Sequence, residues 1–100
     1  MEPIFEEIAS REYRIKGRNE KVVVSLGKPQ KISQASDYYC PYKISISSQE
    51  TVKKIFGVDG FQAIYLTFRI IDSELQNIVK NKSIELDWDG GPFGKLSFPE

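Results

Sequence analysis

The most reactive side chain in the sequence is the thiol of Cys40, which precedes Pro41 and Tyr42. A catalytic cysteine works as the thiolate, and forming a thiolate requires a neighbouring base or a positive environment. The chain contains no histidine and no second cysteine, so neither a Cys–His pair nor an internal disulfide can form. Because free cysteines are usually small buried hydrophobic residues, the sequence predicts a structural role for Cys40.

Three carboxylates at every second position, Glu85, Asp87 and Asp89, alternate with apolar residues. Paired carboxylates can hold a hard cation or act as acid and base. Side chains two residues apart on a strand lie about 7 Å apart, too far for tight shared coordination without added ligands. The alternation is typical of a solvated strand face, and we predict no metal, cofactor or catalytic residue here. The glycine-rich 90–94 segment does not lead into a helix, so it indicates a turn rather than a phosphate loop.

Residues 11–31 are basic, with seven lysines and arginines against two glutamates, an excess of five. Such a hairpin could meet phosphates. No RNA-binding aromatic signature, helix-turn-helix pattern or zinc site accompanies it. Edge strands protected by Lys and Arg explain the same residues, so nucleic-acid binding is a minor alternative.

Composition limits the remaining possibilities. One hundred residues, 40% of them hydrophobic, are enough for one core, and we expect a single α+β domain over 1–100. The 14 basic and 14 acidic residues balance, so no net charge draws the chain to nucleic acid or to an anionic membrane. The acidic N-terminus is unlike a signal peptide, and no run approaches the roughly 18 apolar residues of a membrane span. We therefore expect a cytoplasmic protein.

Hydrophobic alternation at every second residue predicts five strands. The apolar positions fall within 13–15, 22–26, 42–46, 51–56 and 84–88. Residues 4–9 fit either a helical turn or an extended lead-in, and residues 30–39 indicate a loop. Short connections favour a mainly antiparallel sheet with the order ββββαβ, packed on one helix in two layers.

The helix is expected over about 60–80. Asp59 is a good N-cap, and Gln62 stands three residues later as in a capping box. Apolar residues then recur every three or four positions and predict the core-facing stripe. These residues are Phe61, Ile64, Phe68, Ile71, Leu75 and Ile78, with Tyr65 and Val79 at its margins.

A second apolar patch, Ala63, Leu66 and Ile70, falls roughly opposite this stripe at about 100° per residue. Another part of the chain, the 28–41 loop or the 92–98 tail, would cover Leu66 and Ile70. Alternatively, the patch is a homodimer contact, because exposed apolar patches mark interfaces.

The chain resembles a family of small, mostly bacterial proteins classed only as a domain of unknown function. The resemblance covers nearly the whole chain and rests on an order of motifs: Ile8–Tyr13, Leu26–Pro29, Cys40–Tyr42, Gly57–Asp59 with Gln62-Ala63, Leu86–Trp88 and Phe98-Pro99. It implies no activity, cofactor or catalytic residue.

The sequence therefore favours a non-enzymatic module that binds another protein, including a second copy of itself. An accessory or immunity-type protein encoded beside its partner is one concrete form. The alternative is a small-ligand binder or enzyme with a pocket between helix and sheet. Its candidate lining is Tyr38, Tyr39, Cys40, Trp88 and Phe93.

Overall fold

The computed structural model describes residues 5–32, 37–88 and 91–92. The elements in chain order are β1 (Glu7–Ile15), β2 (Lys21–Gly27), β3 (Gln30–Lys31), β4 (Tyr38–Ile46), β5 (Gln49–Gly57), α1 (Gly60–Lys82), β6 (Leu86–Trp88) and β7 (Gly91–Pro92). Four long strands precede the helix and β6 follows it, which confirms the predicted α+β class and the ββββαβ order.

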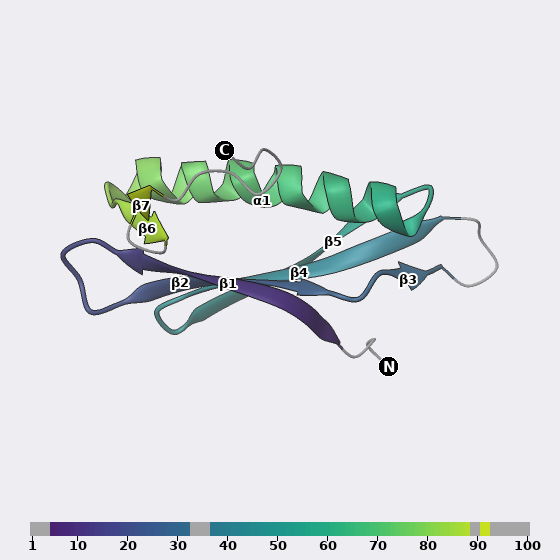
Figure 1. The fold of residues 1–100 in the computed structure, drawn as a ribbon, viewed down its shortest axis with the longest axis horizontal. Helices are drawn as coiled ribbons and strands as arrows, with labels where there is room; N and C mark the ends of the chain where they lie inside the picture. The colour runs from purple at the N-terminus through teal and green to yellow at the C-terminus, as the bar shows by residue number, and fades with distance from the viewer. Residues whose placement is uncertain (1–4, 33–36, 89–90, 93–100) are drawn as a thin grey trace.

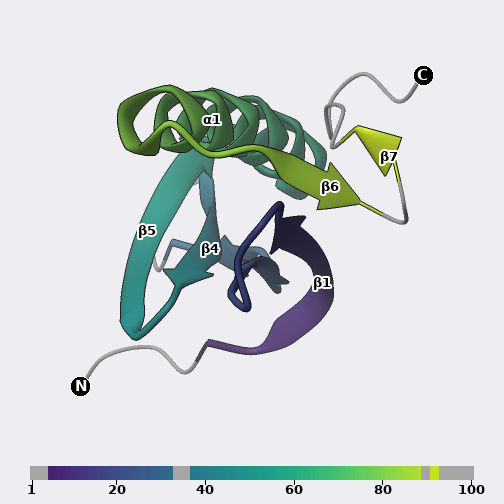
Figure 2. The same ribbon diagram turned by 90° about the vertical axis from the view of Figure 1, so that its left-hand side faces the viewer.

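All strand pairs in the described sheet are antiparallel, in the order β5-β4-β2-β1-β6-β7. The two residues of β3 continue the row of β2 beyond Pro29 and pair with the start of β4. The sheet curves, so that β5 rises on one side of α1 and β1 with β6 on the other (Figures 1 and 2). The helix thus lies over the concave face.

The buried residues follow from the alternation of side chains along each strand. The register places Tyr13 beside Val22 and Val24 beside Ile44, and all four side chains are buried. They pack with Ile71 and Leu75 of α1 into the main core cluster. Because fully burying one such side chain is worth about 1.5–3 kcal/mol, this cluster holds the helix on the sheet.

Two strands begin earlier than the alternation predicts. β1 starts at Glu7, so residues 7–9 of the segment left open are extended, with a bulge between Glu7 and Ala9. β4 starts at Tyr38, inside the segment expected to be a loop. The side chain of Pro41 touches the position that a Cβ on Gly27 would occupy, at 2.7 Å. Gly27 therefore allows β2 and β4 to lie close beside Pro41.

The helix begins where its polar residues place it. The carboxylate of Asp59 accepts a hydrogen bond from the backbone N–H of Gln62 at 2.8 Å. The Gln62 side chain accepts from the N–H of Val58, also at 2.8 Å, one residue before the capping residue. At the other end, Ser83 adopts the left-handed conformation that terminates many helices.

The core-facing side of α1 differs from the predicted stripe. Ala63 and Thr67 are fully buried, whereas Phe61 is 87% exposed. A Cβ on Gly57 would lie 2.6 Å from the backbone N of Ala63, so the helix meets the end of β5 through its small residues. Phe61 precedes Ala63 by two positions, which places it roughly 200° around the helix axis. The contact between Gly57 and Ala63 therefore turns the Phe61 ring to solvent.

Candidate functional site

Three aromatic side chains lie along one flank of α1. Phe61, Tyr65 and Phe68 are spaced by four and three residues, so they neighbour one another on the helix surface. Phe61 is 87% exposed, Tyr65 is 46% exposed and Phe68 is half-buried. We call these three residues the aromatic row. It leads from the exposed start of the helix toward the sheet.

A groove continues from the aromatic row between α1 and β1. Its walls are Ala9, Ser10 and Arg11 of β1, Val24 and Leu26 of β2, and Phe68 and Ile71 of α1. The groove encloses about 180 Å³. Phe68 belongs to both features, so the aromatic row and the groove form one mostly apolar surface.

Arg11 and Trp88 lie at the β6 end of this surface. The guanidinium carbon of Arg11 is 3.8 Å from the centre of the Trp88 ring. A cation over an indole face at this distance is attracted by the ring electrons. Next to Arg11 in the core, burial raises the pKa of the Tyr13 hydroxyl, which therefore stays protonated at neutral pH.

The residues expected to line a pocket lie in different parts of the sheet. Tyr38 packs against the buried Cys40 on the helix-facing side. Tyr39 lies on the outer face, with its ring 6.3 Å from that of Phe56. Trp88 is on β6, with β2 and β1 between it and β4. The structure thus does not bring Tyr38, Tyr39, Cys40 and Trp88 to one cavity, and Phe93 lies outside the described residues.

Cys40 has a packed environment without a base. Its side chain is fully buried, and Sγ donates to the carbonyl oxygen of Gly27 at 3.6 Å. Burial raises the pKa of the thiol above its ordinary value. A raised pKa keeps the sulfur as the weakly nucleophilic thiol.

Leu66 and Ile70 lie on the flank of α1 opposite the aromatic row. One turn further along, the carboxylate of Glu74 pairs with Lys53 of β5 at 2.7 Å, which shows that this flank faces β5. Leu66 is half-buried and Ile70 is 39% exposed. Ala63, grouped with them in the sequence, belongs instead to the core.

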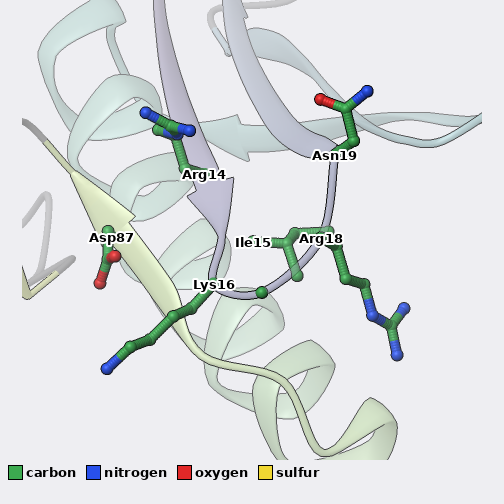
Figure 3. Close-up of a pocket in the computed structure, with 7 residues that line it drawn as sticks. Arg14, Ile15, Lys16, Arg18, Asn19 and Asp87 are labelled. Carbon is green, nitrogen blue, oxygen red and sulfur yellow. The ribbon is translucent and has the colours of Figure 1, made fainter.

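The tip of the basic hairpin forms an open hollow of about 490 Å³ (Figure 3). Arg14, Lys16, Arg18 and Asp87 contribute to its lining, and Lys16 and Arg18 extend in opposite directions. The cations therefore do not converge on one point.

Four cations of the hairpin have acidic partners. The ion pairs are Lys16–Glu85 at 3.4 Å, Arg18–Glu20 at 3.7 Å, Lys21–Glu12 at 3.2 Å and Lys28–Glu6 at 3.9 Å. Glu6 and Glu85 come from outside the basic segment, so the fold reduces the excess positive charge that the sequence suggests. Asp89, the last of the predicted row of acids, lies outside the described residues.

Within residues 5–32, 37–88 and 91–92, no group of three His, Cys, Asp or Glu side chains is arranged to hold a metal ion. In the same part of the chain, no helix combines the length and apolar character needed to cross a membrane.

Sequence reasoning placed Phe61 in the core and Tyr65 at its margin, and so missed the aromatic row as a surface. One available signal was Gly57. A glycine two residues before the N-cap is typical of a close backbone approach, and Ala63 is the small residue that meets it. A helix rotated so that Ala63 faces the sheet has Phe61 facing solvent.

Comparison with curated proteins and with solved structures finds no match. A family model described as a domain of unknown function matches residues 9–100, nearly the whole chain. The chain therefore belongs to the family named Domain of unknown function (DUF6968).

Proposed function

We propose that this chain is a non-enzymatic module that binds another protein through the aromatic row of α1. The observation that carries the proposal is the 87% exposure of Phe61 beside the 46% exposure of Tyr65. Two further large apolar side chains, Phe56 and Val58, are exposed where β5 passes into the helix. Exposed apolar side chains that neighbour one another, as Phe61 and Tyr65 do on the helix, mark sites of protein association.

The surroundings of the aromatic row have the character of an interface. Asp59, Gln62 and Arg69 supply polar groups beside the exposed rings, and the Arg69 guanidinium lies 5.9 Å from the centre of the Tyr65 ring. Apolar centres with polar rims are the usual anatomy of protein interfaces, and aromatic residues supply much of the binding energy. The fold itself gains little from Phe61, because its ring remains in water.

The other functions find less support. The groove of about 180 Å³ is smaller than the roughly 300–1,000 Å³ of small-molecule sites, and the open hollow between α1 and the β4–β5 hairpin, at about 340 Å³, reaches only the lower end of that range. The hairpin cations diverge and are largely paired with acids. An accessory or immunity-type role, in which the chain holds a protein encoded beside it, is one form of the proposed function. Binding of a second copy of the chain, as a homodimer, is another form.

The test compares two variants in which exposed apolar side chains are replaced by serine. The Phe61→Ser/Tyr65→Ser variant removes the exposed part of the aromatic row. The Val52→Ser variant removes an aliphatic side chain that is 53% exposed on β5. Proteins captured from the native cell by the wild-type chain are purified, and their affinity for each variant is measured by calorimetry. Sedimentation of the chain alone tests self-association.

We expect the row variant to bind a partner at least about tenfold more weakly and the Val52→Ser variant to bind normally. Thermal melting serves as the folding control for both. Failure to find any binding protein, including a second copy, would contradict the proposal. A row variant with wild-type affinity would also contradict it.

A further inference from the structure

The outer face of the sheet, which points away from α1, is open. Tyr42 and Ile44 of β4 pack with the helix, and Lys53 of β5 reaches Glu74, so the neighbours of these residues in each strand point outward. No helix or strand of the described chain lies over this face (Figures 1 and 2). Its side chains from β4 and β5, in register, are Tyr39 with Phe56, Pro41 with Lys54, Lys43 with Val52 and Ser45 with Glu50.

Three aromatic rings on this face each lie close to a lysine or to another ring. Nζ of Lys54 is 4.8 Å from the centre of the Tyr39 ring, and the centre of the Phe56 ring is 6.3 Å from the same point. Further along β4, Nζ of Lys43 is 4.5 Å from the centre of the Phe5 ring. Phe56 is 58% exposed and Lys54 is also exposed. We call these five residues the aromatic platform.

Pro41 connects the two halves of the aromatic platform. It lies between Tyr39 and Lys43 on β4, and both Pro41 and Phe5 approach Gly27 of β2. A Cβ on Gly27 would lie 2.7 Å from Pro41 and 3.1 Å from the Phe5 ring. Because Tyr39 and Lys43 are four residues apart, they are separated by about 13 Å along the strand. The rings and ammonium groups therefore form one strip across the outer face.

The two lysines of the platform have no acidic partner in the part of the chain that the structure describes, where every ion pair uses another cation. They differ in this from the four paired cations of the basic hairpin. The carboxylate that β4 and β5 contribute to the outer face is that of Glu50, beyond Val52, and it accepts a hydrogen bond from Ser45 at 3.3 Å. The positive charge of the platform therefore suits an anionic ligand.

We infer that the aromatic platform binds a single-stranded polynucleotide, with bases stacked on Phe56 and Tyr39 and phosphates held by Lys43 and Lys54. Aromatic rings on an open sheet face, with cations beside them, bind single strands because every base has a face that stacks and every phosphate carries a charge. The inference goes beyond the proposed function and does not depend on it, since the aromatic row lies on the helix, on the other side of the sheet.

The arrangement favours this ligand over the alternatives. An apolar partner would bury both ammonium groups without a counter-charge, which costs free energy. A duplex would offer phosphates but keep its base faces within the stack. Lys54 lies over the Tyr39 ring in the free chain, and its flexible stem lets the ammonium move to a phosphate while a base takes its place on the ring.

The probes are fluorescein-labelled oligothymidylate and oligouridylate of about 20 nucleotides, longer than the roughly 4–16 that one such domain covers. Anisotropy measures their binding to the full chain at low salt, where phosphate contacts are strongest. The key variants are Phe56→Leu, which keeps the apolar bulk without the ring, and Lys54→Gln. Phe61→Leu, another exposed ring, and Lys16→Gln, an exposed lysine paired with an acid, are the matched controls.

We expect both oligonucleotides to bind, because the platform contacts bases and phosphates rather than the sugar. Affinity should fall at least about fivefold with Phe56→Leu and stay within about twofold with either control. The slope of log affinity against log salt should be about −1.4, the value for two phosphates, and about half as steep with Lys54→Gln. Thermal melting checks the fold of each variant. Because Phe56 and Lys54 are exposed on different residues of β5, each variant tests the platform without the other.

Several results would overturn the inference. One is the absence of binding to either oligonucleotide at low salt, and another is equal affinity of the wild type, Phe56→Leu and Lys54→Gln. A duplex of the same length that binds as tightly as the single strand would exclude stacking. Binding to anionic lipid vesicles in place of the oligonucleotides would assign the platform to a membrane surface. None of these results bears on the proposed function, whose test changes Phe61 and Tyr65.

Discussion

The guanidinium of Arg11 stacks on the Trp88 ring, 3.8 Å from its centre, and so joins β1 to the last residue of β6. The contact lies at the point where β6 stops and the groove begins. Since Trp88 is the only tryptophan of the chain, its fluorescence reports this contact directly.

Arg11→Ala should shift the emission of Trp88 and lower the free energy of unfolding by about 0.5–1 kcal/mol, the usual worth of an exposed cation–aromatic contact. Arg14→Ala is the matched control, because Arg14 is the next arginine on the same strand and contacts no ring in the described structure. Equal emission spectra for the wild type and both variants would show that the stacking is absent in solution.

Gly57 is required by the close approach of β5 to α1. In Gly57→Ala, the new Cβ would lie 2.6 Å from the backbone N of Ala63, and overpacking of this kind typically costs about 1–3 kcal/mol. Gly60→Ala is the control, because its Cβ would lie 3.8 Å from the nearest atom, on Pro29. Urea unfolding should show Gly57→Ala destabilised and Gly60→Ala unchanged or more stable. The opposite ranking would contradict the contact.

Asp59→Ala should lower the free energy of unfolding by about 1 kcal/mol, because the backbone N–H of Gln62 loses its acceptor. Asp59→Asn keeps an acceptor at the same position and should lose much less. The measurement is urea unfolding at neutral pH. If Asp59→Ala kept full stability yet abolished partner binding, Asp59 would be a contact residue and its role as a cap would be secondary.

The order of elements could be read from the sequence because each element has its own local pattern. The alternation through Val22 and Val24 and the cap at Asp59 need no knowledge of distant residues. Strand order depends on contacts between remote segments. The pairing of Arg14 with Asp87, across more than seventy residues, has no local signal.

The rotation of α1 about its own axis is the feature that the sequence pattern predicts wrongly, and the reason is physical. Hydrophobic type alone favours Phe61 over Ala63 for the core. The choice is made by distance, because a Cβ on Gly57 would lie 2.6 Å from the backbone N of Ala63, so the β5 backbone approaches the helix backbone at Ala63 and turns this residue inward. The candidate surface could not be identified until this orientation was known.

Alkaline pH should destabilise the fold through its buried tyrosines. Burial and the Glu74 carboxylate raise the pKa of the Tyr42 hydroxyl above its ordinary value near 10. Below pH 10 the Tyr42 hydroxyl is protonated in both the folded and the unfolded chain, so the stabilisation that depends on this proton is fully present. Above pH 10 the unfolded chain loses this proton first, so the unfolding free energy falls by up to about 1.4 kcal/mol per pH unit.

Tyr42→Phe isolates this effect, since the two proteins differ only in this hydroxyl. The stability difference between Tyr42→Phe and the wild type should therefore shift in favour of the variant as the pH rises above 10. A difference that stays constant from pH 8 to pH 11 would show that Tyr42 does not titrate differently in the folded and unfolded chains.

The most direct test of the protein-binding function is the affinity of a purified partner for the Phe61→Ser/Tyr65→Ser variant. The proposal predicts a loss of at least about 1.4 kcal/mol in binding free energy with unchanged thermal stability, while Val52→Ser binds as the wild type does. Equal affinities for all three proteins would contradict the assignment of the aromatic row as the contact surface.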